Sequence, residues 1–175
     1  MMKKIISLLS NAGLVCAGIA TISILALGSA LTAQFAFGLQ PCDLCLFQRA
    51  PYVITIILGV TGLFLAVKKK RPKAAALTVL FSAIAFACGA GIAFYHHGVE
   101  QHWWISFLQG CKVSFNSGDL LAQVEAAKAV RCDVIPWADP VFNMSMAAWH
   151  AIMSAGLAIG CFVSSVLIAR RANGF

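Results

Sequence analysis

Four long stretches without a charged side chain constrain the fold of this 175-residue chain more than any other feature. They cover residues of about 12–37, 50–67, 74–95 and 146–169, and none contains Asp, Glu, Lys or Arg. A helix that crosses a bilayer needs roughly 20 consecutive apolar residues, whereas helices of soluble proteins rarely stay uncharged on every face. We therefore predict an all-α membrane protein, a four-transmembrane-helix bundle that forms a single membrane domain over residues 1–175.

The basic residues predict how the bundle is oriented. Nine of the 13 Lys and Arg residues, and none of the six acidic residues, lie before the first stretch, in the connection 68–73 or after the fourth stretch. Because cytoplasmic loops carry an excess of Lys and Arg, both termini and the 68–73 loop are expected in the cytoplasm. The formal charge of +7 therefore indicates membrane topology, and we expect no nucleic-acid partner because no separate basic module exists.

The connections 38–49 and 96–145 are then the extracytoplasmic loops. The second spans 50 residues, which is too long for a simple connector. Helical spacing of its apolar residues after Asp119 predicts a short helix on the membrane surface, covering about 120–130. The N-terminus resembles a signal peptide, but its apolar run of 26 residues exceeds the roughly 7–15 of a signal sequence, so we expect it to remain as a span.

The short outer loop carries the first chemical motif, Cys42-Asp43-Leu44-Cys45. A C-x-x-C pair outside the cytoplasm is more often a redox disulfide than a metal site. Zinc would need two more ligands, and the outward candidates are Cys111, Cys132 and three histidines. The pattern favours redox chemistry over zinc, and we predict no metal site.

Arg49 lies four residues after Cys45, so the two side chains share one face if a helix begins near Cys45. A nearby cation and a helix N-terminus both favour the thiolate, which is the reactive form of cysteine. The alternative is an arginine that extends to the lipid headgroups. The spacing alone does not separate these two interpretations.

Cys111 and Cys132 form the second outward pair. A bond between them would close the long loop and stabilise it by about 3 kcal/mol through chain entropy. The functional alternative is a disulfide offered to a soluble partner, because exchange requires access for an incoming thiolate. The chain has no dinucleotide or P-loop motif, so electrons leaving the C-x-x-C would most simply go to a lipid-soluble carrier. Cys16, Cys88 and Cys161 lie within the spans and are expected to pack as small apolar residues.

Several segments resemble one family. Residues 41–52, PCDLCLFQRAPY, resemble the P-C-x-L-C-x-x-Q-R-x-P-Y signature of the DsbB family, which contains bacterial inner-membrane disulfide-forming oxidoreductases. Residues 95–100 resemble its Y-H-x-G-V-E motif, Cys111 and Cys132 match its second pair, and residues 144–149 resemble the start of its fourth span. His150 stands where the family commonly has Asn.

The resemblance implies an enzyme that oxidises DsbA, a soluble periplasmic thiol oxidant, and reduces membrane quinone, either ubiquinone or menaquinone. By position, Cys111 would form the mixed disulfide with DsbA, and Cys132 would be its partner. Cys42 and Cys45 would reoxidise that pair, with Cys45 facing the quinone. Arg49 would stabilise the Cys45 thiolate and a quinone oxygen, and His96 would line the quinone pocket.

Two other functions stay open at this point. The chain could be a DsbB paralogue that serves a dedicated partner. It could also be a structural or metal-handling membrane protein whose cysteines do not cycle. Reversible redox cycling with quinone would separate the enzyme from the static alternatives.

Overall fold

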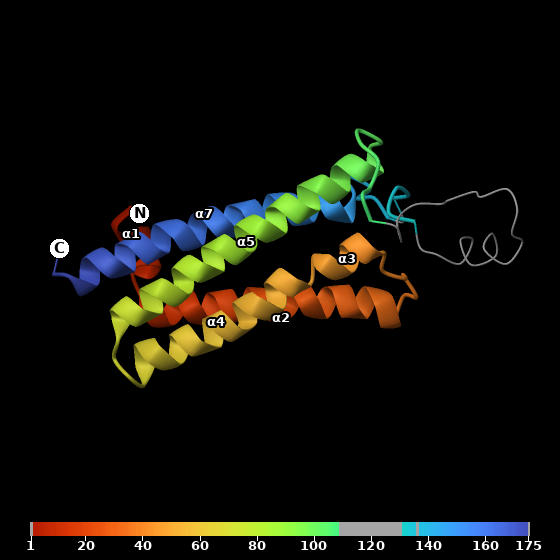
Figure 1. Ribbon diagram of the computed structural model, residues 1–175. Coiled ribbons are helices and arrows are strands. Elements are labelled where there is room, and N and C mark those ends of the chain that lie inside the picture. The colour runs from red at the N-terminus through yellow and green to blue at the C-terminus, as the bar shows by residue number, and fades with distance from the viewer. Residues whose placement is uncertain (1, 109–130, 136, 175) are drawn as a thin grey trace, which may run out of the picture.

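The computed structural model describes residues 2–108, 131–135 and 137–174, and helices dominate these segments (Figure 1). The helices in chain order are α1 (Met2–Leu9), α2 (Ala12–Phe35), α3 (Asp43–Phe47), α4 (Ala50–Val67), α5 (Pro72–Glu100) and α7 (Met146–Ala172). The predicted surface helix over 120–130 lies outside the described residues, as does Cys111.

Four helices are long and apolar enough to cross a membrane: α2, α3 together with α4, α5, and α7. They correspond to the four predicted spans, and the predicted four-helix membrane fold is confirmed. Large apolar side chains point outward along them; Leu25, Ile57 and Ile159 are 66%, 61% and 67% exposed. In a lipid environment such outward apolar side chains contact hydrocarbon, while the helical backbone satisfies its own hydrogen bonds.

The long helices run side by side in Figure 1, with α2 against α4, α4 against α5, and α5 against α7; α2 scarcely contacts α7. Small residues allow this close approach, as is common between membrane helices. A Cβ atom on Gly59 of α4 would come within 2.9 Å of the backbone nitrogen of Ala20 in α2. Cys16 and Cys161 are buried in the same core, as expected, whereas Cys88 is exposed.

The two ends of the bundle differ. Both termini and the α4–α5 turn lie at one end, and α3 lies at the opposite end with the last turns of α5 (Figure 1). The segments predicted to be cytoplasmic therefore share one end, and the C-x-x-C motif lies at the other.

Two differences from the expected elements affect the site. The loop 38–49 contains the short helix α3, which Cys42 caps because its sulfur accepts a hydrogen bond from the backbone N–H of Cys45. Pro51 lies in the first turn of α4, where a proline is tolerated because its missing N–H has no helical partner. In addition, α5 continues to Glu100, five residues beyond the predicted end of the third span, so His96 lies on a helix and not in a loop.

Candidate active site

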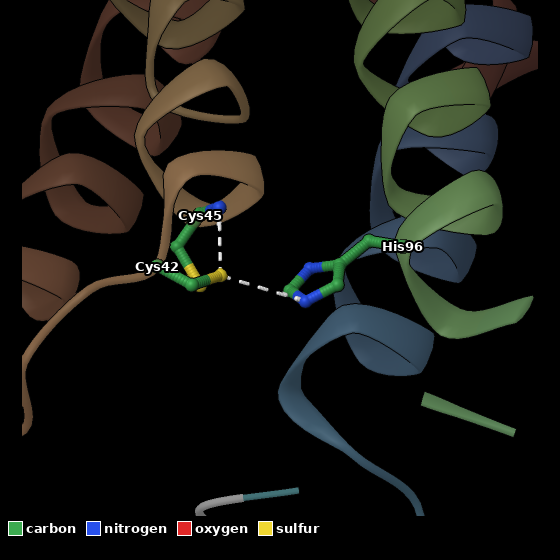
Figure 2. Close-up of side chains that lie close together, drawn as sticks. All are labelled: Cys42, Cys45 and His96. Carbon is green, nitrogen blue, oxygen red and sulfur yellow. Dashed lines mark hydrogen bonds between the residues drawn. The ribbon is translucent and has the colours of Figure 1, made fainter. Parts of the chain in front are cut away.

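Cys42 and Cys45 lie at the two ends of the first turn of α3. Their Sγ atoms are 2.7 Å apart, and the backbone N–H of Cys45 donates to the Cys42 sulfur at 3.3 Å (Figure 2). A disulfide bond is about 2.05 Å long, so the pair can close with a small movement. Cys42 is buried and Cys45 is half-buried, so Cys45 is the more accessible sulfur.

The reduced pair holds its protons unequally. The hydrogen bond between the Cys42 thiol and the Cys45 sulfur, and then burial, raise the pKa of the Cys42 thiol. Cys42 therefore keeps its proton and donates a hydrogen bond to the Cys45 sulfur. This leaves Cys45 as the sulfur that carries negative charge when the pair loses one proton, and a thiolate is the form that reacts.

Figure 2 also shows His96 beside the pair, and its ring could complete a three-ligand metal group. A tetrahedral zinc ion with Zn–S bonds of about 2.3 Å holds two sulfurs about 3.7 Å apart. The observed 2.7 Å is about an ångström shorter. The geometry of the cysteine pair therefore fits disulfide chemistry better than a zinc site.

His96 connects the motif to two other parts of the chain. Its Nε2 lies 3.6 Å from the Cys42 sulfur, and its Nδ1 lies 2.8 Å from the side-chain nitrogen of Gln48. The ring also makes a hydrogen bond with the backbone of Cys132. His96 is buried and contacts one cysteine of each pair, and its place in a quinone pocket remains a prediction.

Cys132 lies in the same buried cluster as the first pair. It is fully buried and disulfide-bonded, and it packs with Cys42, Leu44 and Val99. Cys45, Tyr95 and Leu108 pack against this cluster. The structure thus brings one cysteine of the second pair beside the C-x-x-C motif, although about 90 residues separate them in the sequence.

Arg49 precedes the first residue of α4, makes no side-chain capping hydrogen bond there, and extends to α2. Its Nη1 donates to the side-chain oxygen of Gln34 at 2.7 Å. No hydrogen bond between Arg49 and Cys45 is found in the described residues, although the guanidinium is close enough for its charge to act on the Cys45 sulfur. The role of Arg49 at a thiolate and a quinone oxygen remains a prediction, and Gln34 is a partner that the sequence analysis did not find.

Gln48 and His150 are also site residues that the sequence analysis missed or undervalued. The Gln48 side-chain oxygen lies 2.8 Å from His150 Nδ1, and the His150 ring stacks on Tyr52 with centroids 5.1 Å apart. The available signals were that His150 is a polar side chain in an apolar helix, where a polar group normally has a partner, and that Gln48 matches the Gln of the DsbB-like signature.

A second polar group fastens α5 to α7 next to the cysteines. Ser145 caps α7 by accepting from the Ala148 N–H, and its hydroxyl donates to the buried carboxyl of Glu100. His97 Nδ1 lies 3.4 Å from the same carboxyl. These contacts hold the outer end of α5, and therefore His96, in place.

Comparison with known proteins agrees with this geometry. The family model described as disulfide bond formation protein DsbB matches residues 13–164. The chain belongs to the DsbB family. DsbB-family proteins are disulfide-forming thiol oxidoreductases, and with four apolar helices of membrane length this one is a multi-pass membrane protein.

Individual members of the DsbB family are distant relatives. Disulfide bond formation protein B 2 of Pseudomonas syringae is 28% identical over 150 residues, which cover 85% of this chain and 81% of that protein. Disulfide bond formation protein B of Aromatoleum aromaticum is 26% identical over 173 residues, which cover 91% of this chain and 90% of that protein. An uncharacterized Rickettsia prowazekii protein, RP370, is 32% identical over 81 residues, or 46% of this chain and 44% of its own. No solved structure matches the chain significantly.

Proposed function

We propose that the protein reoxidises a soluble DsbA-type periplasmic oxidant and passes the electrons to membrane quinone. The observation that supports this most strongly is the buried cluster that contains both Cys42 and Cys132. A disulfide that only stapled the long loop would not need to lie against a second, redox-competent cysteine pair.

The proposed thiol steps follow from this arrangement. A thiolate of the partner attacks Cys111 and breaks the Cys111–Cys132 bond, and the partner's second thiolate then releases Cys111, so the partner leaves oxidised and both loop cysteines are reduced. The Cys132 thiolate attacks the Cys42 sulfur, and the Cys42–Cys45 bond breaks with its electron pair on Cys45. Cys111 then attacks Cys132, which restores the loop disulfide and leaves Cys42 and Cys45 reduced.

The residues near Cys45 suit a flat, apolar molecule with two carbonyl oxygens. An apolar cavity of about 340 Å³ lies beside the motif, lined by Leu44, Phe47, Gly91, Ile92, Tyr95, Phe107 and Leu108. Arg49 at the α3–α4 junction does not line this cavity, but its guanidinium is a cationic donor with N–H groups beyond the one bonded to Gln34. When bound, a quinone accepts two electrons and two protons from the reduced pair, which becomes a disulfide again. Arg49 and the cavity would bind and orient it.

The proposed location is the bacterial inner membrane, with both termini in the cytoplasm and the cysteines in the periplasm. The basic segments lie at the end of the bundle opposite to α3 (Figure 1), and the positive-inside rule assigns that end to the cytoplasm. An oxidising compartment on the other side suits two disulfides.

One assay tests this function. The purified protein in detergent is mixed with a reduced DsbA-type protein and with ubiquinone or menaquinone, and quinone reduction is followed by absorbance. We expect turnover that needs both components and is lost in Cys42→Ser. Cysteines that stay fixed as thiols or as disulfides in every mixture would instead support a static membrane protein. Turnover with only one dedicated thiol partner would support the paralogue alternative.

A further inference from the structure

A continuous series of hydrogen bonds joins the interior of the bundle to the cysteine pair. It begins at His150 in α7, passes through the Gln48 side chain between α3 and α4, and continues to His96 in α5. From His96 it reaches the Cys42 sulfur at 3.6 Å and then the Cys45 sulfur at 2.7 Å. Three separate helices and the α3–α4 junction contribute to it, so the series depends on how the helices pack and not on a local sequence motif.

The amide of Gln48 determines the direction of this series. An amide has one donor end and one acceptor end. The Gln48 side-chain oxygen contacts His150 Nδ1, so His150 Nδ1 carries a hydrogen and donates it. The Gln48 side-chain nitrogen donates to His96 Nδ1, so His96 Nδ1 carries no hydrogen and accepts. A neutral His96 ring then carries its hydrogen on Nε2, which faces the Cys42 sulfur at 3.6 Å and the Glu100 carboxyl at 3.9 Å; the ring also hydrogen-bonds the backbone of Cys132. The hydrogen bonds from His150 through Gln48 and His96 therefore donate toward the Cys42 sulfur, and a protonated Cys42 thiol extends this direction to Cys45.

We propose that Gln48 and His150 are positioning residues that keep the Nε2 hydrogen of His96 on the Cys42 sulfur and so stabilise the Cys45 thiolate. Hydrogen bonds aligned head to tail polarise one another, so the last sulfur receives more than the effect of one neighbour. The inference deepens the proposed function, because the stabilised thiolate is the group that would deliver electrons.

His150 is well placed to act on Gln48 and on little else. Its Nε2 is buried and has no hydrogen-bond partner among the described residues, so Nδ1 makes the one hydrogen bond the structure shows for this ring. Its other contact is the stack on Tyr52. Two substitutions separate these contacts. His150→Phe keeps a ring for stacking but loses the donor, and His150→Asn keeps a donor but loses the ring.

Other groups also influence the charge on Cys45 and stay unchanged in the test. Among the described residues, the titratable or charged side chains that lie near it are Cys42 in the α3 cap, Arg49 at the start of α4, and Tyr95, His96 and Glu100 in α5. Arg49 favours a negative charge on Cys45, and Glu100 opposes it. A shift caused by Gln48 or His150 variants therefore has to be transmitted through His96 and Cys42.

The test measures how fast iodoacetamide modifies Cys45 as a function of pH. The full-length protein is reduced in detergent, and modification of each cysteine is resolved by mass spectrometry of its peptides. In Gln48→Glu the new carboxylate accepts hydrogen bonds from both the His150 and the His96 ring. His96 must then carry its hydrogen on Nδ1, and its Nε2 has no hydrogen to donate to the Cys42 sulfur. We expect the pH at which Cys45 modification reaches half its maximal rate (the midpoint) to rise by about one unit. Below that pH the fraction of Cys45 present as thiolate is then about tenfold smaller.

Neutral variants separate this effect from the added charge. Gln48→Met and His150→Phe should each move the midpoint in the same direction by about half a pH unit, roughly a threefold change, and His150→Asn should leave it near the original value. With Cys42 replaced by Ala, the series no longer reaches Cys45, so Gln48→Met should then cause no further shift.

Three results would overturn the proposal. The first is a shift in Gln48→Glu alone, which would reflect only the new charge. The second is an equal shift in His150→Phe and His150→Asn, and the third is a Gln48→Met shift that persists without Cys42. Because the assay contains neither quinone nor a soluble partner, failure of the proposed function would not alter these results.

Discussion

Arg49→Lys is the substitution that best tests whether the α3–α4 junction is built to use quinone. In the structure one guanidinium nitrogen donates to Gln34 at 2.7 Å, which anchors the side chain to α2. The guanidinium has five donors in a planar arrangement, so the remaining N–H groups can serve a quinone oxygen or the Cys45 sulfur while that anchor is kept. A lysine ammonium is a point charge on a flexible stem and cannot reproduce this arrangement.

The expected size of the effect follows from one lost charged hydrogen bond. Such a bond contributes about 1.5–3 kcal/mol, and about 1.4 kcal/mol corresponds to a factor of ten. Arg49→Lys should therefore weaken quinone use roughly 10- to 150-fold, measured as a higher apparent KM for quinone in steady-state absorbance assays. Oxidation of the partner thiol in a single turnover without quinone should stay close to normal, because in the proposed scheme the Cys111–Cys132 disulfide performs that step.

Gln34→Leu is the matched variant. It removes the anchor but keeps the positive charge and all guanidinium donors, so the bond to quinone is loosened and not lost, and we expect a smaller loss, about threefold to tenfold, which corresponds to about 0.7–1.4 kcal/mol. Unchanged quinone kinetics in Arg49→Lys would contradict the reasoning and would identify Arg49 as a residue that only extends to the headgroups.

Three further outcomes are expected. A reporter fused after Arg71 should read as cytoplasmic and one inserted near Asn116 as external; an external signal at Arg71 would reverse the orientation. Cys132→Ser should trap a mixed disulfide between Cys111 and the soluble partner on a non-reducing gel when the partner is supplied oxidised, because the Cys111 thiolate attacks the partner's disulfide and no Cys132 thiolate is left to displace it. Replacing the three cysteines within the spans should leave turnover largely intact. Gly59→Val should destabilise the bundle by about 1–3 kcal/mol through overpacking against the α2 backbone, measured as easier unfolding in mixed detergent.

The membrane fold could be predicted from the sequence because the decisive signal is local. A run of about 20 residues without a charge has few alternatives to a membrane helix, and α4 begins and ends where the predicted second span does. The end of α5 was predicted too early because His96 and Glu100 are polar. The helix continues because these side chains have buried partners, in Gln48 and Cys42 for His96 and in Ser145 for Glu100.

The candidate site was only partly predictable, because only some of its contacts are local in sequence. The C-x-x-C pair is a local motif and could be found directly. The contacts between Gln48 and His150 and between Arg49 and Gln34 depend on how separate helices pack, and hydrophobic patterns carry no information about which polar residues meet. Sequence spacing placed Arg49 on the Cys45 face, but a proline in the first turn of α4 separates that helix from α3 and changes the geometry.

Polar side chains inside the bundle therefore fall into two groups: those whose polar atoms all have hydrogen-bond partners, and those with a polar atom left without one. Ser23 and Thr55 lie 2.8 Å apart between α2 and α4 and are fully buried; the Thr55 hydroxyl donates to the Tyr52 carbonyl and accepts from Ser23. Such hydrogen bonds between membrane helices add stability. His150 differs because one ring nitrogen is engaged by Gln48 and the other is buried without a partner in the described residues. An unpaired buried nitrogen costs about 1–3 kcal/mol, so this nitrogen opposes folding, and the hydrogen bond from Nδ1 to Gln48 is the polar contact that links His150 to the cysteine pair.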